Sequence, residues 1–175
     1  MVAAAAVVAK AQAAKFPGVS TAQVKELQRA KLTTPLPLPT WLPAGFKLEK
    51  IESNLGRSVK IYERSLVIIY SNKLADGRTQ RFALEAGFDG LGDLMYEGAK
   101  TISSPVGKIH LYYEPKDPDT EGEKLKNYVM TEWFDVGGTA FHYIGWYGGE
   151  EKDDPSMAMI SMAHTEKILR SLRRF

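Results

Sequence analysis

The pattern of apolar and polar residues in the middle of the chain is that of β-strands. Residues 46–53, 79–86 and 106–114 alternate between apolar and polar side chains, as half-buried strands do. Residues 58–71 alternate at first and then contain the run Leu-Val-Ile-Ile at 66–69, which predicts a strand buried on both faces.

Two glycines at positions 137 and 138 separate two further apolar segments, residues 128–136 and 139–147. Paired glycines between strands are a strong hairpin signal, because both can adopt the positive φ angles of a tight turn. Residues 87–100 are rich in glycine and predict a loop. No helix-length segment connects the strands, so we expect antiparallel pairing.

Helix signals lie near both ends of the chain. Ser20 and Gln23 have the spacing of a capping box, which predicts a short helix over residues 21–32. In residues 157–175 the apolar side chains recur at three- and four-residue steps, which predicts a C-terminal helix.

Asp154-Pro155 suits the N-cap and first position of that C-terminal helix. Residues 157–162 also alternate like a strand, so the alternative is a short strand there and a helix that starts near Thr165. We favour the longer helix and expect Ile168 and Leu172, four residues apart, to share a face that packs near the predicted hairpin.

Strands in the middle and helices at the two ends predict an α+β fold. We expect a single antiparallel β-sheet of about six strands, with a short N-terminal helix and a C-terminal helix packed on one face. Residues 20–175 are predicted to form this one domain. Within it, four prolines in residues 35–43 predict an extended lead in which Trp41, with Phe46 just after it, covers the sheet edge.

Residues 1–19 form an Ala-rich tail. Its apolar run at 2–9, followed by Ala-Gln-Ala, is similar to the end of a secretory signal peptide without the basic start. We favour a truncated signal peptide over the two alternatives, an Ala-rich linker and a frayed helix. No stretch of the chain reaches the roughly 18 to 20 apolar residues that span a bilayer.

Composition narrows the function classes. The 175 residues carry a formal net charge of +2, so there is no overall field that would favour nucleic acid. We interpret Arg170, Arg173 and Arg174 as a solvated last helical turn. Cysteine is absent, which excludes disulfides, thiolate metal sites and cysteine nucleophiles.

No catalytic or cofactor motif is found in the sequence, and we expect no enzyme activity, cofactor or metal. Residues 117–123 imitate the first half of a calcium loop, but position twelve is Tyr128, so a solvated loop is favoured and calcium is the alternative. The three histidines, His110, His142 and His164, lack metal-ligand spacing and are expected to be hydrogen-bonded structural residues.

Aromatic residues are dense in the last strands. Adjacent rings in a strand point to opposite faces, so one set is core and the other needs a helix, a partner or a ligand to cover it. The candidate ligand- or partner-binding residues are Trp41, Phe46, Tyr112, Trp133, Phe141, Tyr143 and Trp146.

The opening Leu-Pro-Ala-Gly-Phe-Lys-Leu at 42–48 resembles the start of the C-terminal domain of RseB/MucB-type periplasmic regulators and of related uncharacterised lipoprotein-like domains associated with anti-sigma factors. Tyr-Ser-Asn at 70–72, the aromatic segment 133–137 and Ser-Leu at 171–172 extend the likeness. The resemblance implies a non-enzymatic domain in the periplasm or outside the cell that binds a protein or a lipidic ligand.

The leading hypothesis is therefore a binding or regulatory domain of the bacterial cell envelope that engages a protein partner through an aromatic sheet face or edge. The alternative is a carrier or sensor of a lipid or acyl chain held under the C-terminal helix. An enzyme without a familiar motif is third. We expect neither nucleic-acid binding nor a membrane span.

Overall fold

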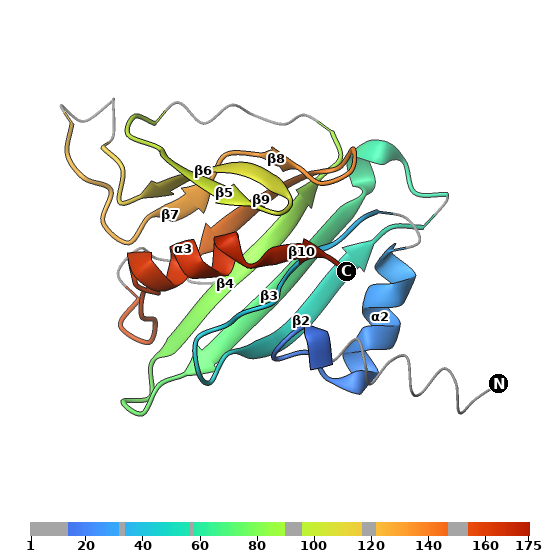
Figure 1. Cartoon of the computed structure of the whole chain (residues 1–175), viewed down its shortest axis with the longest axis horizontal. Helices are drawn as coiled ribbons and strands as arrows, with labels where there is room; N and C mark the ends of the chain where they lie inside the picture. The colour runs from blue at the N-terminus through green and yellow to red at the C-terminus, as the bar shows by residue number, and fades with distance from the viewer. Residues whose placement is uncertain (1–13, 32–33, 57, 90–95, 117–121, 147–153) are drawn as a thin grey trace.

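The computed structural model describes residues 14–31, 34–56, 58–89, 96–116, 122–146 and 154–175. Figure 1 shows a large sheet with the C-terminal helix and a small second sheet of two short strands across one face, and the N-terminal helix beside an edge strand. The elements are α2 (Thr21–Lys31), β1 (Pro37–Pro39), β2 (Lys47–Asn54), the 3-10 turn η1 (Ile61–Glu63), β3 (Ser65–Lys73), β4 (Thr79–Gly87), β5 (Lys100–Ser104), β6 (Gly107–Tyr113), β7 (Val129–Thr131), β8 (Phe134–Asp135), β9 (Ala140–Gly145), α3 (Met162–Arg170) and β10 (Leu172–Arg174).

The main sheet has eight strands in the order β2-β3-β4-β9-β7-β6-β5, with β8 also paired to β9. All its ladders are antiparallel, so the α+β class is confirmed. The prediction of a single sheet of about six strands was wrong. The additional strands are short or polar: β7 and β8 have three and two residues, and β5 (KTISS) has one buried apolar side chain.

The prolines of the lead form one strand of a second, two-stranded sheet. β1 pairs with β10, with Pro39 opposite Leu172. Proline cannot donate to a ladder, so it suits a strand with only one neighbour. Leu36 and Leu38 are completely buried, which anchors this ribbon on the face of the main sheet.

The predicted capping box is confirmed at the start of α2. The Gln23 backbone N–H donates to Ser20 Oγ at 3.3 Å, and the Ser20 N–H donates to Gln23 Oε1 at 2.9 Å. Ahead of it, Phe16 and Val19, which belong to the expected tail, are buried in the core. The Leu48 N–H donates to the Gly18 carbonyl at 2.9 Å, so this segment covers the start of the edge strand β2.

Gly18→Ala is expected to destabilise the protein more than Gly77→Ala does. Both glycines have φ near +80° (+76° and +87°), where alanine costs about 1 to 2 kcal/mol. A Cβ at Gly18 would lie 2.8 Å from Lys47 Cα, whereas nothing lies within 4 Å at Gly77. Chemical denaturation should therefore show about 1 kcal/mol or more of additional loss for Gly18→Ala. Equal losses would contradict tight docking of this segment.

The C-terminal helix is shorter than predicted. It begins at Met162, where Ser161 is the N-cap, and its C-cap is Ser171. The hydrogen bond from Ser171 Oγ to the Ile168 carbonyl (2.8 Å) and that from the Trp41 N–H to Ser171 Oγ (3.2 Å) hold the chain at this point. The prediction of the longer helix was thus wrong, and Leu172 lies in a strand instead of sharing a helix face with Ile168.

The core lies between the main sheet and the layer made of α2, the ribbon and α3. The prediction that residues 66–69 are buried on both faces is confirmed: Leu66 and Ile68 belong to this core, while Val67 and Ile69 form a small cluster with Ala83 on the other face. In the described part of the chain, no helix has the length and apolar character needed to cross a membrane.

Candidate functional site

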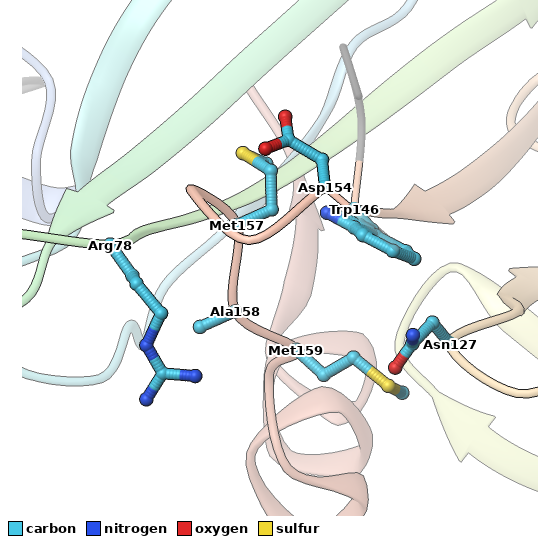
Figure 2. Close-up of a pocket in the computed structure, with 7 residues that line it drawn as sticks. All are labelled: Arg78, Asn127, Trp146, Asp154, Met157, Ala158 and Met159. Atoms are coloured by element: carbon cyan, nitrogen blue, oxygen red, sulfur yellow. The ribbon is translucent and has the colours of Figure 1, made fainter. Parts of the chain in front are cut away.

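A pocket of about 400 Å³ opens beside the turn between β3 and β4, where β9 ends and the segment before α3 begins. Four separate parts of the chain meet there (Figure 2). The lining residues are Arg78, Asn127, Trp146, Asp154, Met157, Ala158 and Met159.

One wall of the pocket is the segment before α3, and it is fixed to the start of β4. The Thr79 N–H donates to the Ser156 carbonyl at 2.8 Å, and the Ala158 N–H donates to the Thr79 carbonyl at 2.9 Å. Gln80 Nε2 donates to the Met159 carbonyl at 2.8 Å. These contacts hold the wall in place without any ligand.

Trp146 follows β9 directly and has an unusual backbone. Its φ is +55°, and its N–H donates to the Arg81 carbonyl at 2.8 Å. A bulky residue at positive φ is an outlier that the surrounding structure must hold in place. Its indole Nε1 is buried and has no hydrogen-bond partner among the described residues. Such a donor costs about 1 to 3 kcal/mol until an acceptor reaches it.

Among the described residues, only two other non-glycine residues have positive φ, and both lie at this end of the molecule. They are Glu114 (φ +47°) and Asn127 (φ +61°). The two residues are linked, because the Asn127 backbone N–H donates to the Glu114 side-chain oxygen Oε1 at 3.2 Å. Asparagine adopts such angles routinely, whereas a positive φ at Trp146 and Glu114 is strained, and strain of this kind concentrates at ligand sites and switch regions.

The pocket carries both signs of charge. Arg78 Nε donates to Asp76 Oδ2 at 2.8 Å, so its guanidinium is oriented from the turn. Hydrogen bonds from Ser156, including that from its N–H to Asp154 Oδ1 at 2.8 Å, hold the pKa of Asp154 below its ordinary value. Asp154 is therefore ionised at neutral pH.

Met157 and Met159 supply the apolar part of the lining. Figure 2 shows the Met159 thioether pointing toward the Asn127 side chain, while Arg78 lies on the other side of the chain segment in that view. Methionine is flexible and polarisable, so this surface can adapt to side chains of different shape. The arrangement suits an amphipathic group and contains no nucleophile–base pair.

The seven aromatic residues predicted as a binding site do not gather in one place. Phe46, Phe141 and Tyr143 are buried in the core. Tyr112 is buried too; burial and its hydrogen bond to Glu132 (2.7 Å) raise its pKa to about 12.

Only the three tryptophans in that set remain partly exposed, and they lie apart. Trp41 lies against α3, where Lys167 Nζ is 4.1 Å from the centre of its ring. Trp133 stacks on His142 with ring centres 4.0 Å apart, beside the hairpin of β8 and β9. Trp146 is the one that lines the pocket.

The histidines make local contacts. His110 Nδ1 is 3.2 Å from Thr101 Oγ1, and His142 Nε2 is 3.2 Å from Glu85 Oε2. In the part of the chain that the structure describes, no group of three or more His, Asp or Glu could hold a metal ion. The calcium-like loop lies mostly at residues 117–121, outside the described residues.

Sequence reasoning missed most of the pocket. Arg78 and Asn127 were not singled out from the sequence, and the two methionines were assigned to a helix. Their juxtaposition depends on the parallel bridge between Thr79 and Met157, which joins segments that are far apart in the sequence. The alternation at 157–162 was the only local signal that this segment is extended.

Comparison of the chain with models of protein families, with curated proteins and with solved structures finds no match in any of the three.

Proposed function

We propose that the protein is a non-enzymatic binding domain of the bacterial cell envelope, or secreted, and that an extended segment of a protein partner occupies the Trp146 pocket. The resemblance at 42–48 and the Ala-rich first residues support the compartment. The pocket lies at the end of the sheet, so the proposed binding site is this pocket and not the aromatic sheet face that the sequence suggested.

One observation carries the proposal: Trp146 is held at positive φ beside a pocket, and in the described part of the chain its indole N–H has no acceptor. Native proteins rarely leave a buried donor unpaired, and each case calls for a reason. A carbonyl oxygen from a bound peptide, reached after a small shift of the ring, would satisfy this donor. Binding would then recover the free energy that the unpaired donor costs.

The lining also indicates what the partner segment carries. Met157 and Met159 favour an apolar side chain, since thioethers pack well against aliphatic and aromatic groups. Arg78 and Asp154 place opposite charges around it, so flanking charges on the partner set orientation more than affinity. We therefore expect a short extended motif with one apolar anchor.

The acyl-carrier alternative has less support. It needs space beneath α3, but Thr165, Ile168 and Leu169 on the sheet side of that helix are completely buried. Ile168 and Leu169 pack into the same core as the ribbon residue Leu172. A filled interface fits a structural helix better than a cover over a ligand.

Site-specific photo-crosslinking tests the proposal. A benzophenone amino acid at position 78, which is exposed beside the pocket, is expected to crosslink one protein partner in cells that make the full chain. The crosslinked segment, made as a peptide, should bind the purified protein. Trp146→Phe keeps a ring but removes the donor, and should weaken that binding by about tenfold or more.

The matched control is the same crosslinker at Lys108, an exposed residue of β6. Similar crosslinks from positions 78 and 108, or unchanged peptide affinity in Trp146→Phe, would contradict the pocket as the site. An acyl chain found by native mass spectrometry in place of a crosslinked protein would favour the carrier alternative.

A further inference from the structure

Charge is distributed very unevenly between the two layers of the fold. Residues 14–43 and 158–175, which contain α2, the ribbon and α3, hold eight Lys and Arg but only two Glu, a net charge of +6. The other residues that the structure describes hold twelve Lys and Arg against twelve Asp and Glu, a net charge of zero. The whole-chain value of +2 hides this separation.

The fold collects these cations on one side. The apolar residues of α2, the ribbon and α3 belong to one core on the same side of the main sheet, and Figure 1 shows α3 and the ribbon crossing that face while α2 lies beside the edge strand β2. Their apolar side chains are turned toward the sheet, so the charged ones are left on the outer surface. Seven of the eight cations are exposed and Arg173 is partly so. We call this outer surface of residues 14–43 and 158–175 the basic face.

Aromatic rings lie among the cations of the basic face. Lys31 Nζ lies 5.5 Å from the ring centre of Phe175, which is buried beneath it, and Lys167 Nζ lies 4.1 Å from that of Trp41. Trp41 is partly exposed, and Met162 at the start of α3 is 37% exposed. Lysines next to tryptophan and exposed apolar groups are typical of surfaces that meet lipid headgroups.

We propose that the basic face docks the protein onto a membrane surface that contains anionic lipids. A cluster of four to eight Lys and Arg is the range at which such lipids attract a protein, at about 1 kcal/mol for each cation near the surface. The cations are spread over two helices and a ribbon, which fits an extended charged plane better than a single acidic peptide. In this orientation the opposite face of the main sheet points away from the membrane.

Vesicle co-sedimentation of the full chain tests this proposal. We expect binding to phosphatidylcholine vesicles that contain about 30% phosphatidylglycerol in about 50 mM salt, and little binding to pure phosphatidylcholine. In about 500 mM salt the binding should be lost, because the exposed charges are screened. Lys25→Glu with Lys167→Glu should lower the partition coefficient by about tenfold or more.

The control is Lys108→Glu with Lys126→Glu, which changes net charge equally from exposed positions outside the basic face. It should keep at least half of the wild-type binding. If the charge-reversed pair fails to fold, Lys25→Gln with Lys167→Gln provides the same comparison. Absence of vesicle binding at low salt, or equal binding to the two vesicle types, would overturn the proposal. So would an equal loss of binding in the Lys108/Lys126 control. Binding to soluble polyglutamate without binding to vesicles would overturn it too, because it would indicate an acidic peptide as the partner.

Discussion

Phe82→Ala is expected to lower the free energy of unfolding by about 3 to 5 kcal/mol. The Phe82 ring is completely buried on β4. It stacks between Tyr70 on β3 and Tyr143 on β9, with ring centres 4.9 and 5.2 Å away, and Phe46 lies 5.8 Å away on a third side. Truncation leaves a cavity among stiff rings that cannot collapse into it, which places the loss at the upper end of large-to-small substitutions.

Urea denaturation followed by circular dichroism measures this loss, with Tyr70→Phe as the control. The Tyr70 hydroxyl is buried and meets no hydrogen-bond partner within the described ranges, and burial raises its pKa well above the ordinary value. Removing such a group is expected to change stability by less than about 1 kcal/mol, or to increase it. A loss below about 1 kcal/mol in Phe82→Ala would show that the ring stack does not form as described.

Leu172→Ala is expected to destabilise the protein by about 2 to 5 kcal/mol. Leu172 is completely buried in β10 opposite Pro39, and it belongs to the same core as Leu36, Leu38 and Ile168. Its truncation would loosen the ribbon and the end of α3 together. The result also separates the two functional hypotheses, since a mobile helix over an acyl chain would make the ligand-free protein insensitive to this change.

Met162→Ala serves as the control for that variant, because Met162 is 37% exposed at the other end of α3 and should lose no more than about 0.5 kcal/mol. Mass spectrometry of the purified proteins should be run in parallel to detect any lipid. A stable Leu172→Ala variant from which a lipid has been lost would support the carrier hypothesis and contradict the structural role of the ribbon.

The parts of the fold that could be predicted are those specified by neighbouring residues. Three features depend only on residues a few positions apart, and each is present in the structure. They are the Ser20–Gln23 capping box, the Asp76-Gly77 turn and the paired glycines before β9. The run at 66–69 is similar, because a continuous apolar segment must be covered on both faces wherever the strand lies.

The parts that could not be predicted depend on distant residues. The periodic apolar residues after 157 fit a helix, but hydrogen bonds from Thr79 and Gln80 keep 157–159 extended, and Ser171 ends the helix against Trp41. In the candidate site, Trp146 could be singled out as an aromatic residue. The positive φ of Trp146 and the residues around it could not be predicted, because they result from packing between separate segments.

The ribbon of β1 and β10 also has a consequence for how the protein folds. Thr40 and Ser171, which are hydrogen-bonded at its end, are 131 positions apart in the chain. Bringing such distant segments together early would cost a large loop-closure entropy for only three residue pairs. The hairpins of the main sheet are local and shorten this loop once formed, so the ribbon is expected to close late and to be absent from the folding nucleus. Substitutions there should then accelerate unfolding while leaving the rate of folding nearly unchanged.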